Sequence, residues 1–182
     1  MEYNCDVQIK TLIEKDDSQA LSLIYDQYAD GLYGYLLNFF GVRDDADEVL
    51  QRVFLKIVEQ RQKLLNVSRI QNYLFIVTRN EAINYHREMK RQSRFLENWE
   101  SVVTIQSEPD MLSHDDSGLI AEVLSQLPDA QREVIYLKIY EELTFDAIAT
   151  ILDISANTVA SRYRYGMDKL RKRLIGSFTI ER

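Results

Sequence analysis

Apolar residues recur at helical spacing along most of the N-terminal half of the chain. The two clearest sets are Leu21, Ile24, Tyr25, Tyr28, Leu32, Tyr35 and Leu36, and then Leu50, Val53, Phe54, Ile57 and Val58. Between them, residues 41–48 (GVRDDADE) predict a turn and an acidic helix start capped by Asp44 or Asp45. A break over residues 66–72 (NVSRIQN) precedes a further helix over 73–92. The pattern predicts a helical bundle that ends near residue 92.

The pattern changes over residues 95–118, which contain six acidic residues, no Lys or Arg, and Pro109. This composition is typical of a solvated tether. Amphipathic helices are expected after it, over residues 119–127, 128–142 and 144–152, with a last helix from Ser155. We therefore expect an all-α protein of two small helical domains joined by a flexible acidic linker. The expected ranges are 1–92 for the first domain, 93–118 for the linker and 119–182 for the second domain.

The segment 144–173 carries the sharpest local pattern. Thr144 is placed to cap one helix, Asp153 tolerates a left-handed turn, and Ser155 is placed to cap the next helix. This spacing is typical of a helix-turn-helix. The expected buried residues are Phe145, Ile148, Ala149 and Leu152 in the first helix and Val159, Tyr163, Gly166 and Leu170 in the second.

The other face of that second helix combines small residues with amide and guanidinium donors, which suits close approach to the major groove of DNA. Its candidate DNA contacts are Asn157, Thr158, Ala160, Ser161, Arg162, Arg164 and Tyr165. A short helical hairpin with a solvated basic tail is the alternative interpretation, since cations near a helix C-terminus also favour the dipole.

Charge is segregated along the chain. The 182 residues have a net charge of −7, yet residues 79–94 carry five Lys or Arg against two Glu, and residues 162–173 carry six against one Asp. Two basic stretches in an acidic body predict two localised anionic contacts. The first stretch, together with the residues just before it, places Tyr73, Phe75, Tyr85 and His86 near cations and amides, which suits unstacked single-stranded bases. Tyr73 and Tyr85 also fit the core or its rim.

Several other classes of protein are excluded or disfavoured by composition. A single cysteine, Cys5, makes no internal disulfide, and two histidines give no zinc-ligand spacing, so we expect neither a metal nor a cofactor. No apolar run approaches the about 20 residues of a membrane span, and the N-terminus lacks the features of a secretion signal. A cytoplasmic protein without membrane insertion is expected. No set of side chains for nucleophilic or acid–base catalysis stands out.

Three ordered stretches, DDADEVLQRVFLKI, NYLFIVTRNEAINYHREMKR and LSQLPDAQREVIYLKIYEELTFDAIATILDISANTVASRYRYGMDKLRKRL, resemble the bacterial sigma-70 family of RNA polymerase sigma factors, in its extracytoplasmic-function group. The resemblance covers roughly residues 15–175. It implies a non-enzymatic subunit that binds core RNA polymerase, directs it to promoters and promotes DNA melting. It also implies two promoter-reading domains, usually called regions two and four, and an anti-sigma factor as a further partner.

The resemblance assigns roles to individual residues. Residues Asp47, Glu48, Gln51, Arg52 and Phe54 match the surface that docks on the clamp coiled coil of the largest polymerase subunit, with Arg52 where glutamate is usual. Residues 66–72 match the loop that captures a flipped base of the minus-ten element. The implied minus-ten and melting contacts are Arg69, Arg79, Asn80, Asn84, Arg87 and Arg91, with Asn84 where aspartate is common.

The second domain matches the reader of the minus-thirty-five element, which in the family also meets the flap region of the polymerase. Its recognition helix carries Ala160 where a basic residue is frequent. The acidic linker is expected to thread into basic channels of the polymerase. Two rival interpretations remain at this point: a conventional helix-turn-helix transcription regulator, and a protein-binding helical adaptor whose basic patches are solvated faces.

Overall fold

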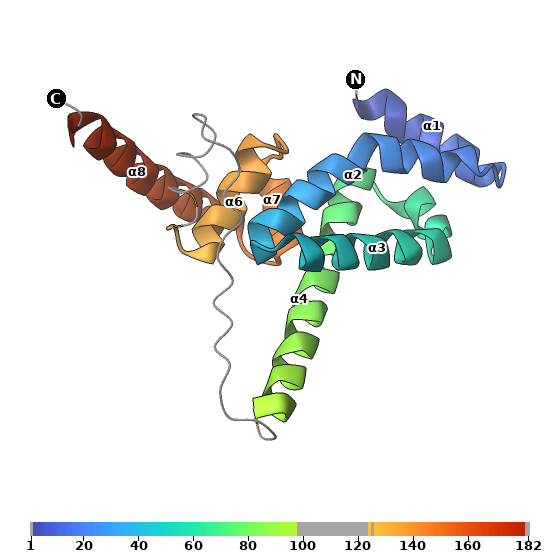
Figure 1. Ribbon diagram of the computed structural model, residues 1–182. Helices are drawn as coiled ribbons and strands as arrows, with labels where there is room; N and C mark the ends of the chain where they lie inside the picture. Colours follow the sequence, from blue (N-terminus) through green and yellow to red (C-terminus); the bar gives the residue numbers. More distant parts are fainter. Residues whose placement is uncertain (1, 98–123, 125, 181–182) are drawn as a thin grey trace. The chain divides into compact units, whose positions relative to one another are not determined.

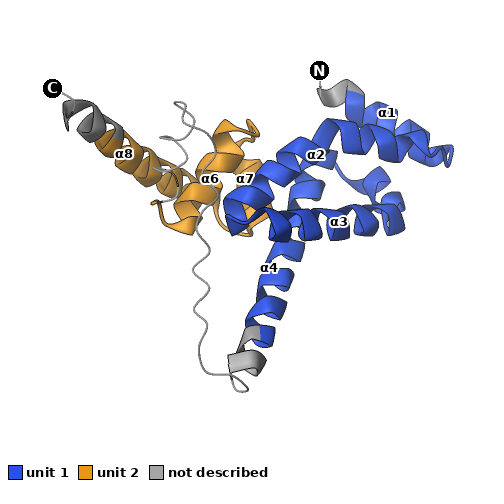
Figure 2. Ribbon diagram, viewed as in Figure 1, with its two compact units in different colours: residues 1–108 blue, residues 109–182 orange. Residues whose placement is uncertain are grey.

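The computed structural model describes residues 2–97, 124 and 126–180, and helices but no strand occur among them (Figure 1). The chain divides into two compact units, residues 1–108 and residues 109–182 (Figure 2). The expected all-α class with two helical units is confirmed. The expected flexibility of the acidic linker lies outside the described residues, as does most of the helix expected over 119–127. None of the described helices is long and apolar enough to cross a membrane.

Unit 1 contains five helical segments among its described residues: α1 (Glu2–Glu14), α2 (Gln19–Phe40), α3 (Arg43–Glu59), the 3-10 helix η1 (Arg61–Asn66) and α4 (Ile70–Glu97). α2 packs against α1, α3 and α4, and η1 lies against α1. Their apolar faces meet in one core, within which Tyr35 and Phe75 pack edge to face with ring centroids 5.6 Å apart. Other fully buried side chains include Ile9, Ile13, Ile24, Leu32, Leu36, Leu64, Ile70 and Leu74.

The turn between α2 and α3 differs from the expectation. Gly41 ends α2 with φ +72°, a left-handed conformation that favours glycine, and its N–H donates to the carbonyl of Leu37. α3 then begins at Arg43, with Val42 at the cap position in an extended conformation. The prediction that Asp44 or Asp45 caps this helix is wrong. Both carboxylates lie within its first turn, where they still favour the helix dipole.

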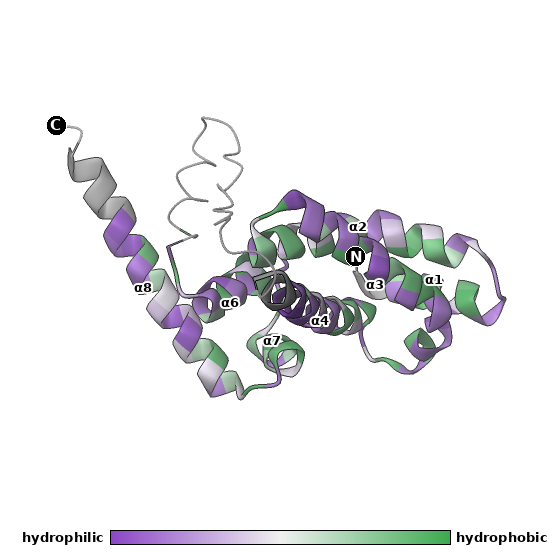
Figure 3. Cartoon of the chain, turned by 60° about the horizontal axis from the view of Figure 1, so that its bottom comes forward, coloured by the Kyte–Doolittle hydropathy of each residue, from purple (hydrophilic) through white to green (hydrophobic). Residues whose placement is uncertain are grey.

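The two halves of α4 have different surroundings. Its first half is packed into unit 1 through Ile70, Leu74, Phe75 and Ala82, which are buried. Beyond Tyr85 every described side chain, residues 86–92, is exposed. Figure 3 shows this end of α4 as predominantly hydrophilic. Unit 1 therefore presents a long charged helix end that is not needed to close its core.

Unit 2 comprises α6 (Asp129–Ile139), α7 (Phe145–Leu152) and α8 (Ala156–Ile180) among its described residues. Pro128 stands at the cap position of α6, where its missing N–H costs no hydrogen bond. α6 and α7 both pack against α8 around a small apolar core. Its buried residues include Val134, Ile135, Leu137, Ile148, Ile151, Leu152 and Val159.

Candidate polymerase and promoter interfaces

The turn between α7 and α8 is held by interactions between residues close in sequence. Thr144 Oγ1 accepts a hydrogen bond from the N–H of Ala147 at 3.2 Å, which caps α7. Asp153 ends the helix at φ 55° and ψ 49°, and the next N–H, that of Ile154, donates back to Ala149 at 3.1 Å. The helix-turn-helix and both roles expected for Thr144 and Asp153 are confirmed.

The start of α8 is fixed by Ser155, as expected from the sequence. Its Oγ accepts from the N–H of Thr158 at 3.1 Å and lies 2.8 Å from Thr158 Oγ1. The Thr158 hydroxyl is therefore engaged in the cap, which limits its use as a DNA contact. Among the remaining candidate residues, Asn157, Arg164 and Tyr165 are exposed, whereas Ala160, Ser161 and Arg162 are half-buried. The Arg164 guanidinium lies over the Tyr165 ring, 5.2 Å from its centroid.

Close contact between α6 and α8 depends on Gly166, which is buried. A Cβ atom at this position would lie 2.6 Å from Ile135 Cδ1 and 3.4 Å from Gln131 Cβ. Glycine thus allows the two helices to approach more closely than any other residue permits. The exposed face of α8 takes its orientation within unit 2 from this contact.

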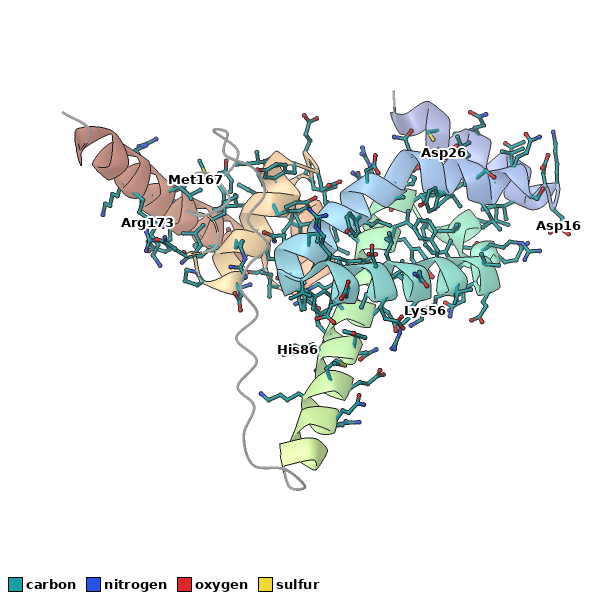
Figure 4. All side chains as sticks on the ribbon, in the orientation of Figure 1. Asp16, Asp26, Lys56, His86, Met167 and Arg173 are labelled. Atoms are coloured by element: carbon teal, nitrogen blue, oxygen red, sulfur yellow. The ribbon has the colours of Figure 1, made fainter. Side chains whose placement is uncertain are left out.

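Four of the five candidate minus-ten residues on α4 form one stripe. Asn80, Asn84, Arg87 and Arg91 follow each other at intervals of four, three and four positions, and all four side chains are exposed. His86, labelled in Figure 4, lies on the same exposed part of the helix. Arg69 is also exposed but precedes the helix, while Arg79 is half-buried. The stripe offers amide and guanidinium donors along one edge of a helix.

The aromatic residues of α4 belong mainly to the core. Phe75 and Tyr85 are buried and Tyr73 is half-buried, so among the four rings named for single-stranded bases His86 alone is exposed. The Tyr85 hydroxyl donates to Asp45 Oδ1 at 2.8 Å. Burial first, and then this hydrogen bond, raise the pKa of Tyr85 to about 12, so the hydroxyl remains a donor at neutral pH. Of the two interpretations of Tyr85, the core role is confirmed.

The outer face of α3 combines polar and apolar side chains. Asp47, Glu48 and Gln51 are exposed near its start, and Leu55, one turn further on, is 65% exposed. Phe54 packs against Tyr25 of α2, with ring centroids 5.0 Å apart. Tyr25 and Val58 also remain exposed. The exposed Tyr25, Leu55 and Val58 adjoin the residues expected to bind polymerase, and the sequence alone predicted no binding role for these three.

Arg52 ties α3 to α4. Its Nε donates to Glu48 Oε1 at 2.8 Å and its Nη1 to Glu88 Oε2 at 3.0 Å, and its guanidinium lies 5.0 Å from the centroid of the Tyr85 ring. These carboxylates raise the pKa of Arg52, which is charged in any case. Lys56 adds a second tie, to Glu81 at 3.0 Å. The positive charge of Arg52 is therefore balanced by neighbouring carboxylates.

In the part of the chain that the structure describes, no group of three or more His, Cys, Asp or Glu side chains is placed to hold a metal ion. The geometry instead provides surfaces: the mixed face of α3, the polar stripe of α4 and the helix-turn-helix of unit 2.

Comparison with known protein families accounts for both units. Residues 24–92 match the model of sigma-70 region 2, and residues 123–172 match that of sigma-70, region 4. The ECF RNA polymerase sigma factor SigL of Mycobacterium tuberculosis is 30% identical over 157 residues, which are 85% of this chain and 89% of that protein. The chain belongs to the extracytoplasmic-function (ECF) sigma factors. It is a transcription initiation factor that binds core RNA polymerase, directs it to promoters and promotes DNA melting.

Other similar proteins agree with this assignment. The RNA polymerase sigma factor SigZ of Bacillus subtilis is 27% identical over 169 residues, which are 87% of this chain and 89% of that protein. Among solved structures, the sigma factor RpoE from Bartonella quintana, in complex with the anti-sigma factor NepR, has a TM-score of 0.65 at 20% identity and covers 92% of this chain and 99% of its own. CnrH, in complex with the cytosolic domain of CnrY, has a TM-score of 0.63 at 18% identity, covering 96% and 97%. Both show the same fold.

The family assignment decides between the rival interpretations. The interpretation as a conventional helix-turn-helix regulator is not favoured, because it does not explain why residues 24–92 match region 2. Sigma factors are in general non-enzymatic initiation factors. Helix α1 precedes both matched ranges; its residues were expected within the first helical domain, but the sequence predicted no separate helix and no role for them.

Proposed function

We propose that this ECF sigma factor reads opened minus-ten DNA with residues 1–92 and the minus-thirty-five element with residues 119–182, through an acidic linker at 93–118. The observation that carries the proposal is the presence of one exposed, donor-rich helix surface in each unit, on α4 and on α8. The overall charge of −7 makes these two surfaces the places where DNA approach is least opposed. Free DNA affinity is expected to be weak and to become effective once both units are held by core polymerase.

At the minus-ten element, the contacts proposed are Arg69, Arg79 and the α4 stripe of Asn80, Asn84, Arg87 and Arg91. Amide and guanidinium groups on one helix edge match a strand whose bases are unpaired and whose phosphates run alongside. Capture of unpaired bases supplies binding free energy that offsets unstacking. Melting therefore needs no chemical step by this chain, and we propose that it is not an enzyme and acts in the cytoplasm without a cofactor.

At the minus-thirty-five element, the proposed contacts lie on α8. The exposed side chains of Asn157, Arg164 and Tyr165 lead this surface, and Ser161, Arg162, Ala160 and Thr158 complete it. Stacking of Arg164 on Tyr165 holds the guanidinium in a limited set of orientations, which suits hydrogen bonding to a base edge or phosphate.

For polymerase, we propose the α3 surface formed by Asp47, Glu48, Gln51, Arg52 and Phe54. The exposed Leu55 beside these residues supports the proposal, because an apolar centre with a charged rim is typical of protein interfaces. The largest-subunit clamp and the flap region are the expected polymerase contacts. An anti-sigma factor is proposed as a further partner, because the similar RpoE was solved with one.

A reciprocal substitution experiment tests the two DNA assignments. Arg162→Ala with Arg164→Ala should weaken closed-complex binding by the holoenzyme about tenfold or more, because each lost phosphate or base contact costs on the order of 1 kcal/mol. Asn80→Ala with Arg87→Ala should instead reduce permanganate reactivity of unpaired thymines and spare closed-complex binding. Both pairs should keep wild-type affinity for core polymerase in competition with a housekeeping sigma factor. Undiminished melting in the second pair would contradict the α4 assignment.

A further inference from the structure

Helix α1 runs beside the segment from η1 to the start of α4, and the two are joined at three points. Asp6 bonds to Ile70, Lys10 to Val67, and Asp16, just after the helix, to Arg61. Because the partner numbers fall as the α1 numbers rise, the two segments are antiparallel. Figure 4 labels Asp16 at the turn that follows α1. α1 also packs against η1, and Ile9 and Ile13 of α1 and Leu64 of η1 are all buried.

Asp6 acts on the first residue of α4. Its Oδ2 accepts from the backbone N–H of Ile70 at 3.1 Å, and its Oδ1 accepts from the Tyr28 hydroxyl at 3.0 Å. The first N–H groups of a helix have no partner within the helix, and a carboxylate there also favours the dipole. Asp6 therefore serves as a helix cap supplied from 64 residues away, and Tyr28 fixes the orientation of its carboxylate.

Lys10 acts on the residues just before that helix. Its Nζ donates to the carbonyl of Val67 at 2.6 Å, in a partly buried contact. Charge-assisted bonds of this kind are about twice as strong as neutral ones. Asp6 and Lys10 lie one helical turn apart on α1. Asp6 bonds to Ile70 and Lys10 to Val67, three positions earlier. Between these bonds, Ser68 and Arg69 are exposed.

We propose that α1 is a splint that sets the conformation of the 67–70 loop, and that Asp6 and Lys10 are positioning residues for capture of a minus-ten base. This inference rests on the proposed minus-ten contact of Arg69 and on the base-capturing role that the family resemblance implies for residues 66–72. Neither residue is required to touch DNA. Asp6 and Lys10 order the loop before DNA binds. Less of the binding free energy of the captured base is then used to order the loop, and more of it stabilises the opened promoter.

The test measures base capture rather than overall activity. A promoter is first selected from random-sequence fragments by the wild-type holoenzyme, and its non-template minus-ten strand is then synthesised with single abasic sites. For wild-type holoenzyme, loss of the captured base should weaken binding about tenfold, as is typical of one stacked base. For Asp6→Ala or Lys10→Met this penalty should shrink to about twofold, since a disordered loop gains little from the base.

Matched controls at the last residue of the same helix and the residue after it separate positioning from charge. Glu14→Gln and Lys15→Met change the same charges at exposed side chains and should keep the wild-type abasic penalty. Affinity for core polymerase should be unchanged in all four variants. Should Asp6→Ala lose core binding, Lys10→Met, which removes a single bond, decides the question. If removal of the captured base weakens binding by Lys10→Met as much as binding by wild type, the role proposed for α1 is overturned.

The same measurements distinguish a failure of the role proposed for α1 from a failure of the role proposed for the loop. Arg69→Ala alters the exposed loop and leaves both α1 bonds in place. If an abasic site weakens binding equally at every position for wild type and for Arg69→Ala, the loop does not capture a base. The role proposed for α1 then fails with the role proposed for the loop. If Arg69→Ala reduces the penalty while Asp6→Ala and Lys10→Met keep it, the loop reads DNA and the role of α1 is overturned.

Discussion

The two elements proposed to read DNA are held in place in opposite ways. The start of α8 is fixed by bonds between near neighbours, such as the Ser155 side chain with the N–H of Thr158 three residues later. The start of α4 and the loop before it are fixed by Asp6 and Lys10, from 64 and 57 residues away. The start of α8 is thus held by its own neighbours in sequence, whereas the start of α4 is held by a helix far away in sequence.

This difference has a physical consequence for each reader. Local caps form as soon as their helix forms and depend little on distant packing. Long-range bonds form only when α1 has packed through Ile9 and Ile13, so they report on the integrity of the whole unit. We therefore expect damage to α8 to stay within unit 2, and damage to α1 to reach the 67–70 loop.

The largest effect is expected at the contact between α6 and α8. Gly166→Val should destabilise unit 2 by about 2 kcal/mol, because the added side chain collides with Ile135 in a packed core. Hydrogen exchange followed by mass spectrometry should show faster exchange in α6, α7 and α8 and unchanged exchange in unit 1. Lys169→Val, at an exposed position of the same helix, is the control. Unaltered exchange in Gly166→Val would mean that Ile135 moves aside without cost.

An intermediate effect is expected at the local cap of α8. Ser155→Ala should cost about 1 kcal/mol and speed exchange in the first turn of α8, because the N–H of Thr158 loses its acceptor. Ser18→Ala is a close control, since Ser18 occupies the cap position of α2 and makes no cap bond. Equal effects of the two substitutions, measured by the same exchange experiment, would refute the role given to the Ser155 side chain.

The smallest effect is expected at Arg52, between α3 and α4. Arg52→Met should cost about 0.5 kcal/mol in urea unfolding, because its ion pairs with Glu48 and Glu88 are largely solvated. The difference from wild type should fall further in 1 M salt, which screens such pairs. Lys63→Met removes a side chain that bonds to the neutral Gln60 at the cap of η1, and should show no such salt dependence. A loss of stability that does not change with salt would indicate that Arg52 acts by packing on Tyr85 instead.

Much of the fold was predictable because its signals are local. Helical periodicity predicted α2, α3 and α4, and Thr144, Asp153 and Ser155 marked the helix-turn-helix with the conformations that the structure shows. The cap of α3 was predicted wrongly. Two adjacent aspartates favoured that position, but Gly41 ends α2 so close by that the helix already begins at Arg43, and Asp45 bonds to Tyr85 instead.

The candidate sites were predictable only in part. The stripe of Asn80, Asn84, Arg87 and Arg91 followed from helical spacing, and its exposure was found as expected; its role in DNA binding stays a prediction. The contacts of Asp6 with Ile70 and of Arg52 with Glu88 join residues far apart in sequence, and no pattern in one chain indicates which partner each side chain meets. Such pairings are determined by packing.

In α8, the side chains that hold the helix in place are largely distinct from those that point outward. Ser155, Val159 and Gly166 set its start and its depth in unit 2, whereas Asn157 and Arg164 are exposed and take no part in that support. Substitutions at the outward positions therefore carry almost no folding penalty. Promoter preference can diverge between paralogues, or be re-engineered, by exchanging these side chains on an unchanged scaffold.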